Sequence, residues 1–267
     1  MTVAAPARVT VPVAASAALR PVLAGPADGA LLGAGASGAW VRLGDEVMVL
    51  TPPGEVRFPN GVEVPAALLR ELQPGAACRA GGGSLDTGGW RLEVRASWDP
   101  RPRLPRVDPS LVRAAAAALA APAVDGWGLA AAMAEHNATA ALAAAHRLIG
   151  SGPGLTPLGD DVVVAALAGS LLLGEAVGSR GLVRFAAGLA GPLDSLARER
   201  TTMLSATLLR HACRGEVDDA SAALLQALCG RGDPAAALAA LLAVGHTSGG
   251  GLAAGIMAAA AAAGRAC

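Results

Sequence analysis

The chain has 267 residues and a formal net charge of zero, with 21 basic and 21 acidic residues. A neutral chain has no bulk electrostatic attraction to nucleic acid or to an anionic membrane. Every basic residue is an arginine, which excludes chemistry that needs lysine, such as a Schiff base or a GK[ST] phosphate-binding loop.

Hydropathy and cysteine spacing narrow the class of protein further. No apolar run reaches the roughly 18 residues that would suggest a membrane-spanning helix, and the first residues lack the basic start of a signal peptide. We therefore expect a soluble, cytoplasmic protein. Cys78, Cys213, Cys229 and Cys267 are far apart and form no C-x-x-C pair, so we expect neither a disulfide framework nor a zinc site.

Residues 1–105 are predicted to form a small β-rich domain. Valine-rich segments at residues 39–53 and 56–65 are interrupted by Gly-Asp, Pro-Pro and Asn-Gly turns. Residues 90–98, WRLEVRASW, alternate apolar with polar side chains, which is typical of a half-buried strand. The segment PAALLRELQPG, residues 65–75, fits a short helix.

A proline-rich, basic segment follows at residues 99–110, DPRPRLPRVDPS. We interpret it as a linker or domain boundary. Its arginines could contact an acidic partner, but we favour a solvated linker.

Residues 106–267 are predicted to form an alanine-rich, all-helical domain. Asp108, Asp218 and Asp233 stand where N-caps are expected, and a proline follows the first and the last of them directly. No alternation of strands and helices indicates a Rossmann-type sheet. The predicted fold class is α+β, with a small β-rich N-terminal domain followed by an Ala-rich all-helical C-terminal domain.

Further helices are predicted over residues 133–149, from Asp194 to near Gly215, and from near Gly250. Glycine or proline marks most of their ends. Three polar motifs lie at or beside the predicted starts of apolar helices, and they carry the functional prediction.

The first motif is GSGPGLTPLGDD, residues 150–161, followed at once by an apolar run. One aspartate is explained as a helix cap near the positive end of the helix dipole. The second aspartate and the glycine-rich lead-in need another reason, because such a loop at a helix start also binds anions. Two carboxylates, Asp160 and Asp161, would repel a bare phosphate unless a cation intervenes. We therefore favour a ligand that joins an anionic group to an amide, carbamoyl or ureido NH₂.

The second motif, VGHTSGGGLAAGIM at residues 244–257, repeats the order of helix, polar loop, glycines and apolar helix. Its glycines would let a ligand approach the backbone closely. The simpler alternative is that Thr247 or Ser248 is an N-cap and that His246 satisfies a neighbouring helix end. No G-x-S-x-G elbow supports a Ser/His/Asp triad.

The third motif is RERTTMLSATLLRH, residues 198–211. In one continuous helix, Thr201 and Ser205 would lie on the same ridge as Leu208 and Ala212. These hydroxyls would either bond to carbonyls of their own helix or line a wall that binds phosphate or carboxylate oxygens.

Taken in order, the three motifs resemble the oxamate carbamoyltransferase subunit family, which is associated with allantoin and purine degradation. The resemblance covers about residues 150–260, and the Gly-Leu-Thr-Pro-x-Gly-Asp-Asp motif is its most specific part. It implies carbamoyl transfer between carbamoyl phosphate and oxamate, giving or consuming oxalurate. It also implies a multi-subunit complex with a second carbamoyltransferase subunit and a protein resembling acyl-CoA synthetases.

Two features of the sequence, at three positions, depart from the pattern of that family. Leu158 stands where a small hydroxyl residue is expected, and Gly250 and Gly251 stand where a tryptophan and a polar residue are expected. Both departures remove side chains from loops of the expected site, which bears on the identity of the substrate.

The expected catalytic residues are His246, as proton carrier, together with Asp160 and Asp161, which would accept from an NH₂ group or hold Mg²⁺. Substrate oxygens would bind backbone N–H groups and hydroxyls of the three motifs. These expected substrate-binding residues are Gly154, Leu155, Thr156, Thr201, Thr202, Ser205, Gly245, Thr247, Ser248 and Gly249.

Two other functions remain open from the residues alone. The chain could be a non-catalytic subunit that positions or stabilises a partner, because alanine-rich helices pack closely against another chain. It could also be an amidohydrolase-like enzyme that acts on a ureido compound.

Overall fold

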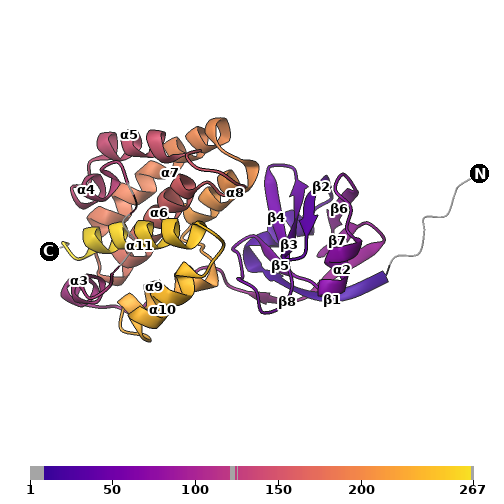
Figure 1. Ribbon diagram of the computed structural model, residues 1–267, viewed down its shortest axis with the longest axis horizontal. Helices are drawn as coiled ribbons and strands as arrows, with labels where there is room; N and C mark the ends of the chain where they lie inside the picture. The colour runs from indigo at the N-terminus through magenta and orange to yellow at the C-terminus, as the bar shows by residue number, and fades with distance from the viewer. Residues whose placement is uncertain (1–8, 121–123, 125, 266–267) are drawn as a thin grey trace, which may run out of the picture. The chain divides into compact units, whose positions relative to one another are not determined.

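The computed structural model describes residues 9–120, 124 and 126–265. The chain forms two compact units, Met1–Pro100 and Arg101–Cys267, of which the first is built mainly of strands and the second of helices (Figure 1). The division into a domain of residues 1–105 and a domain of residues 106–267, each folding independently, stays a prediction. No described helix is both long and apolar enough to cross a membrane.

The first unit is a closed barrel with the strand order β1-β5-β4-β3-β2-β6-β7-β8. Its strands are β1 Val9–Ser16, β2 Ala27–Gly35, β3 Gly38–Leu43, β4 Glu46–Thr51, β5 Gly61–Glu63, β6 Ala77–Gly81, β7 Ser84–Thr87 and β8 Trp90–Trp98. Three short helical segments accompany them, namely η1 Ala17–Leu19, α1 Arg20–Ala24 and α2 Ala66–Glu71.

Two of the strand pairs are parallel, and one of them, β1 with β8, closes the barrel. β1 pairs with β8 from Val9 beside Trp90 to Ser16 beside Trp98, and β4 pairs in parallel with β5. The other neighbours are antiparallel. Closure leaves no free sheet edge along these strands.

Tight turns set the register of the last three strands. Gly82 and Gly83 connect β6 to β7, Gly88 and Gly89 connect β7 to β8, and all four have positive φ angles of 56° to 105°. Two-residue hairpin turns need such angles, which glycine adopts without a steric penalty.

The predicted fold class is wrong in its account of the N-terminal part, which is a closed eight-stranded barrel. The strands at residues 90–98 and around the Gly-Asp turn are confirmed, as is the short helix after Pro65. The prediction missed β1, β2, β6 and β7. The sequences of β2 and β6, ADGALLGAG and ACRAG, are rich in alanine and glycine and show little β-propensity. The parallel pairing of β1 with β8 joins distant segments, and no local pattern reports it.

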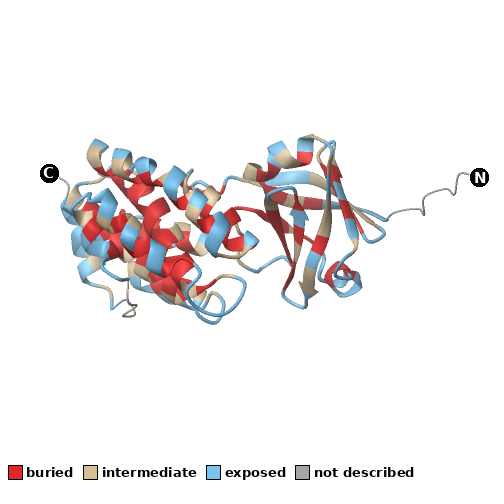
Figure 2. Ribbon diagram, turned by 90° about the horizontal axis from the view of Figure 1, so that it is seen from above, coloured by how far each residue is buried: buried red, intermediate tan, exposed pale blue. Residues whose placement is uncertain are grey.

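The second unit is helical throughout its regular elements. Its helices are α3 Pro109–Ala117, α4 Leu129–Ala134, α5 Ala138–Leu148, α6 Leu158–Ala176, α7 Arg180–Arg200, α8 Met203–Ala212, α9 Asp219–Leu228, α10 Pro234–Leu242 and α11 Ser248–Ala263. α6 and α11 pack closely together and are mostly buried, so they form the centre of the unit (Figures 1 and 2).

The predicted N-caps Asp108, Asp218 and Asp233 are confirmed, since each accepts a backbone hydrogen bond at the start of its helix. Pro122, expected to end the first helix, lies outside the described residues. The predicted helix at 133–149 is wrong as a single element. It is divided between α4 and α5, where His136 has a φ of 51° and Asn137 caps α5.

The helix predicted to run from Asp194 to near Gly215 is also wrong. α7 already begins at Arg180, contains Pro192 inside it, and ends at Arg200. α8 then starts anew with Thr202 as its N-cap. Cys78, Cys213 and Cys229 are free thiols, and Cys267 lies outside the described residues.

Candidate functional site

The candidate site is built around the glycine-rich loop, residues 150–157, which connects α5 to α6. Thr202, the N-cap of α8, donates a 2.6 Å hydrogen bond to the carbonyl oxygen of Leu155. Ser248, the first residue of α11, has its hydroxyl 3.0 Å from the hydroxyl of Thr156. The first turns of α6, α8 and α11 therefore meet at this loop, and each brings the positive end of a helix dipole to it.

The glycine-rich loop keeps backbone donors available for a ligand. Within the described part of the chain, no group accepts a hydrogen bond from the backbone N–H of Leu155 or Thr156. Leu155 is 51% exposed, and Gly154 beside it is exposed with a φ of 97°. Exposed N–H groups next to helix starts are suited to binding phosphate or carboxylate oxygens.

Asp160 holds the glycine-rich loop in place and does not cap a helix. α6 begins at Leu158 with Pro157 as its N-cap, which corrects the explanation of either aspartate as a cap. The Asp160 carboxylate is buried, and its Oδ1 accepts a 2.7 Å hydrogen bond from the backbone N–H of Gly150. Its Oδ2 accepts a short hydrogen bond from the hydroxyl of Thr201. Both carboxylate oxygens are thus engaged by the protein itself.

Asp161 is in a different state from its neighbour. It is 4% exposed, and its Oδ2 has no hydrogen-bond partner among the described residues. The pKa of Asp161 is raised to about 8, mainly by burial. A hydrogen bond from Ser248 lowers the pKa, whereas the charges of Asp160 and Asp218 raise it further. At neutral pH Asp161 is therefore mainly a neutral carboxylic acid. The acidic pair therefore carries mainly one negative charge at neutral pH, which repels a bound anion less than two charges would.

The third motif contributes hydroxyls from a break between two helices. Thr201 and Thr202 lie between α7 and α8, so the predicted ridge that joins Thr201 to Ser205 is wrong. The Ser205 hydroxyl is 3.4 Å from the Leu155 carbonyl oxygen, and its backbone N–H donates to the Thr202 hydroxyl. The hydroxyl hydrogens of Thr201, Thr202 and Ser205 are all directed to acceptors within the protein.

The loop between α10 and α11, here called the histidine loop (residues 243–247), leaves His246 and Thr247 exposed. Thr247 occupies the N-cap position of α11 but makes no side-chain cap bond. The backbone N–H of Gly249 donates to the Val244 carbonyl oxygen, so this expected ligand donor is already used.

Glycines allow the start of α11 to approach α6 closely. A Cβ atom at Gly251 would lie 2.8 Å from the Leu158 carbonyl oxygen and 2.9 Å from the Asp161 Cβ. A Cβ atom at Gly249 would overlap the Leu241 carbonyl oxygen, whereas one at Gly250 would meet no atom within 4 Å. Glycine is therefore needed at 251 for the approach of α11 to Asp161 and at 249 for its approach to the end of α10.

With this geometry established, we compared the chain with protein families, curated proteins and solved structures. Residues 148–260 match the model of the family "Oxamate carbamoyltransferase subunit AllH". The resemblance predicted from the three motifs is confirmed. No curated protein and no solved structure shows a significant match. The segment matched by the AllH model contains the glycine-rich loop, α6, α8, the histidine loop and most of α11, so it includes every part of the candidate site.

Within the AllH-matched segment, the acidic pair is a poor metal site. In the described ranges of the chain, no group of three or more His, Cys, Asp or Glu residues could hold a metal ion. Mg²⁺ at the acidic pair would compete with the hydrogen bonds from Gly150 and Thr201 to Asp160. It would also require Asp161 to lose its proton, because carboxylate ligands bind Mg²⁺ in ionised form.

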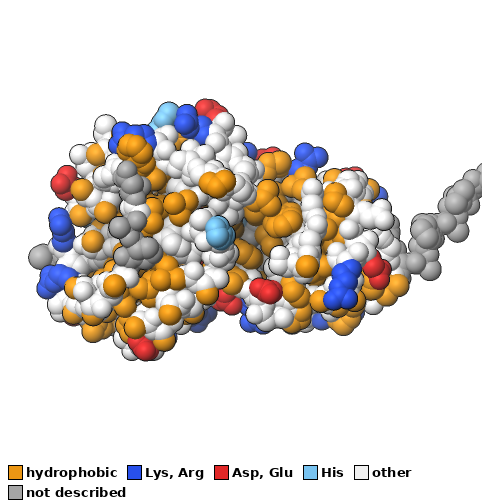
Figure 3. All heavy atoms as spheres, in the orientation of Figure 1, with side chains coloured by type: hydrophobic (Ala, Val, Ile, Leu, Met, Phe, Trp, Pro, Cys, Tyr) orange, Lys and Arg blue, Asp and Glu red, His pale blue; other side chains and the backbone are white. Residues whose placement is uncertain are grey.

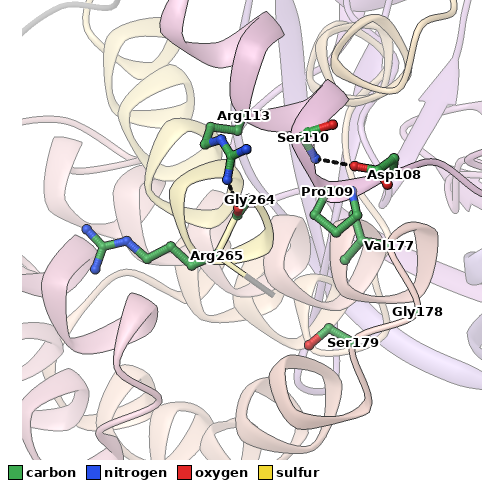
Figure 4. A pocket seen from close by; sticks show the side chains of 9 residues that line it. All are labelled: Asp108, Pro109, Ser110, Arg113, Val177, Gly178, Ser179, Gly264 and Arg265. Carbon is green, nitrogen blue, oxygen red and sulfur yellow. Dashed lines mark hydrogen bonds between the residues drawn. The ribbon is translucent and has the colours of Figure 1, made fainter. Parts of the chain in front are cut away.

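A cavity of about 500 Å³ lies at the starts of α3 and α7, and none of the candidate-site residues lines it (Figure 4). One of its two arginines is already used, because Arg113 donates a 3.0 Å hydrogen bond to the Gly264 carbonyl oxygen at the end of α11. Asp108 caps α3 through Ser110, and the side chain of Arg265 extends away from the other labelled residues. These contacts stabilise helix ends and leave few polar groups for a ligand.

Three residues that sequence reasoning did not assign to the site belong to it. Gly150 donates to Asp160, and Gly251 makes room for the α11 start. Asp218 was predicted only as a helix cap, yet it is buried and its charge acts on Asp161. Only the place of Gly150 as the first residue of the first motif could have indicated its role from sequence.

Proposed function

We propose that this chain is a subunit of a carbamoyltransferase that moves a carbamoyl group between carbamoyl phosphate and oxamate or a related ureido acid. The observation that carries the proposal is the meeting of three helix starts at the glycine-rich loop, inside the segment that matches the AllH model. Carbamoyl phosphate and oxamate both join an anionic group to an NH₂ group, which suits a site that offers N–H donors beside carboxyl groups.

In the proposed reaction, the oxamate nitrogen attacks the carbamoyl carbon and forms a C–N bond. The C–O bond to phosphate breaks, phosphate leaves with the electron pair, and the attacking nitrogen loses a proton to give oxalurate. Catalysis of this step needs the two substrates held in line and the charge on the leaving phosphate stabilised.

We assign the binding of phosphate or carboxylate oxygens to the backbone N–H groups of Leu155 and Thr156. Ser248 and Thr247 add hydroxyls at the start of α11. Asp161 is buried and bonded to Ser248, so it is assigned to the support of that hydroxyl, and the exposed His246 is assigned to proton transfer. Asp160 and Thr201 position the loop.

A second candidate function is that of a non-catalytic subunit whose site is completed by another chain. It is favoured by apolar side chains next to the site, since Leu155, Met203 and Leu242 are 51%, 41% and 40% exposed. Figure 3 shows hydrophobic side chains over much of the visible face of the helical unit. Exposed apolar residues beside a polar site are suited to contact with a second subunit. A second carbamoyltransferase subunit and an acyl-CoA-synthetase-like protein are the partners we propose.

The test is formation of oxalurate from carbamoyl phosphate and oxamate, measured by mass spectrometry together with oxamate-dependent phosphate release. The full chain is assayed alone and then with its candidate partner subunits. Thr156→Val removes a site hydroxyl, and Ser110→Ala, at an exposed position on α3, is the matched control.

Oxalurate formed by the chain alone, and reduced by Thr156→Val but not by Ser110→Ala, would support a catalytic subunit. Oxalurate formed only with partners, with the same dependence on Thr156, would support a site completed at an interface. No oxalurate under either condition would overturn the proposed reaction.

A further inference from the structure

A chain of hydrogen bonds connects the buried Asp161 to the exposed glycine-rich loop. Ser248 bonds to the Asp161 carboxyl group, and the hydroxyls of Ser248 and Thr156 are 3.0 Å apart, where either can be the donor. Asp161 is buried at one end, whereas Thr156 is part of the loop at the other end. The three residues come from two helix starts and the loop between α5 and α6.

The direction of these hydrogen bonds depends on the proton of Asp161, because each hydroxyl has a single hydrogen to donate. When Asp161 is ionised it can only accept, so Ser248 donates to Asp161 and Thr156 donates to Ser248. Thr156 then offers only lone pairs to the loop. When Asp161 is protonated it can donate to Ser248, Ser248 can donate to Thr156, and the Thr156 hydrogen becomes available to a ligand.

We propose that Asp161 acts through Ser248 as a positioning residue that decides whether Thr156 donates or accepts a hydrogen bond at the glycine-rich loop. In the protonated state the loop presents a hydroxyl donor beside the backbone N–H groups of Leu155 and Thr156, which selects a carboxylate or phosphate oxygen. In the ionised state it presents an acceptor there, which disfavours these anions. The identity of the ligand rests on the proposed function, whereas the effect of Asp161 on Thr156 rests on the hydrogen bonds through Ser248.

The surroundings of Asp161 keep the protonated state populated at neutral pH. Burial is the main cause of its raised pKa, Asp160 on its own helix and Asp218 at the start of α9 add negative charge, and Ser248 on α11 opposes them. The unpartnered Oδ2 of Asp161 is consistent with this state, because an isolated buried oxygen costs less when the carboxyl group is neutral. The change in direction is expected near pH 8.

The first measurement uses the ligand-free full chain and nuclear magnetic resonance. The carboxyl carbon of Asp161 and the methyl group of Thr156 are followed between pH 6.5 and 9.5. We expect both signals to move with the same midpoint in the wild type. In Ser248→Ala, the Asp161 signal should still titrate and the Thr156 signal should not follow it. A Thr156 signal that ignores Asp161 in the wild type would overturn the inference.

The second measurement is the affinity for oxamate over the same pH range, by calorimetry, with the full chain and with its complex. The oxamate carboxylate is ionised throughout, so a change reports on the protein. We expect the dissociation constant to rise about tenfold between pH 7 and pH 9.5, a change that corresponds to about 1.4 kcal/mol. Thr156→Val and Ser248→Ala should bind more weakly with little pH dependence, and Ser110→Ala should follow the wild type.

The outcomes separate the two proposals. Oxamate binding that is independent of pH in the wild type would overturn the inference and leave the proposed function standing. Coupled titration of Asp161 and Thr156 without oxamate binding under any condition would support the hydrogen-bond device and overturn the proposed substrate.

Discussion

Thr201 donates its hydroxyl hydrogen to the carboxylate of Asp160, a residue 41 positions earlier in the chain. This contact joins the end of α7 to the first turn of α6, while the other oxygen of Asp160 holds Gly150. The glycine-rich loop is therefore held at its beginning by a buried carboxylate that itself depends on a distant hydroxyl.

Replacing Thr201 by valine should destabilise the helical unit. Valine keeps the shape of threonine but leaves one buried oxygen of Asp160 without its donor, which we expect to lower the free energy of unfolding by about 1–3 kcal/mol. Urea unfolding followed by circular dichroism checks this, with the exposed Thr139→Val on α5 as the matched control. Equal stability of the two variants would mean that the Asp160 contact contributes nothing net.

Two adjacent glycines of α11 should respond in opposite ways to alanine. Gly251→Ala places a Cβ 2.8 Å from the Leu158 carbonyl oxygen, so we expect a loss of about 1–3 kcal/mol from overpacking. Gly250→Ala meets open space and should stabilise the helix by roughly 0.5–1 kcal/mol. Thermal unfolding of both variants measures the contrast, and destabilisation by Gly250→Ala of the same size as by Gly251→Ala would contradict the close approach of α11 to α6.

Asp161→Asn should change how stability depends on pH. The pKa of Asp161 rises from 3.8 when unfolded to about 8 when folded. Between these values the folded chain retains a proton that the unfolded chain has released, so this group's contribution to stability is full below about pH 4 and is lost as the pH rises towards 8.

Asparagine does not titrate, so the variant should gain stability relative to the wild type by up to about 1.4 kcal/mol for each pH unit in that window. Urea unfolding of both proteins at pH 5 and pH 8 checks the sign. A stability difference that is the same at both pH values would show that the carboxyl group of Asp161 is not held in its neutral form.

The barrel offers a matched pair of glycines as well. A Cβ at Gly29 on β2 would overlap the Arg42 carbonyl oxygen on β3, whereas one at Gly25 would meet no atom within 4 Å. We expect Gly29→Ala to lower the free energy of unfolding by about 1–3 kcal/mol and Gly25→Ala to change it by less than about 0.5 kcal/mol. Unfolding followed by tryptophan fluorescence reports mainly on this unit, because three of the four tryptophans, Trp40, Trp90 and Trp98, lie in its strands. A barrel that tolerates both changes equally would argue against the β2–β3 register described above.

Local chemistry made part of this structure readable from the sequence. Asp218 and Asp233 indicate helix starts because a cap depends only on the residues that follow it. Residues 90–98 indicate a strand through the alternation of apolar and polar side chains. Barrel closure depends on β1 meeting β8, and the different states of Asp160 and Asp161 depend on Thr201 and Asp218. These contacts join segments tens of residues apart, so local sequence patterns do not predict them.

The parallel pairing of β1 with β8 has a practical consequence for handling the protein. Because Val9 lies beside Trp90 and Ser16 beside Trp98, the chain enters the barrel at the end where β8 begins and continues past Trp98 from the opposite end. A fluorophore or affinity handle attached ahead of Val9 is therefore separated from Trp98, where β8 ends, by the length of one strand. Such a handle suits the capture of partner subunits, because it leaves the exit end of the barrel unmodified.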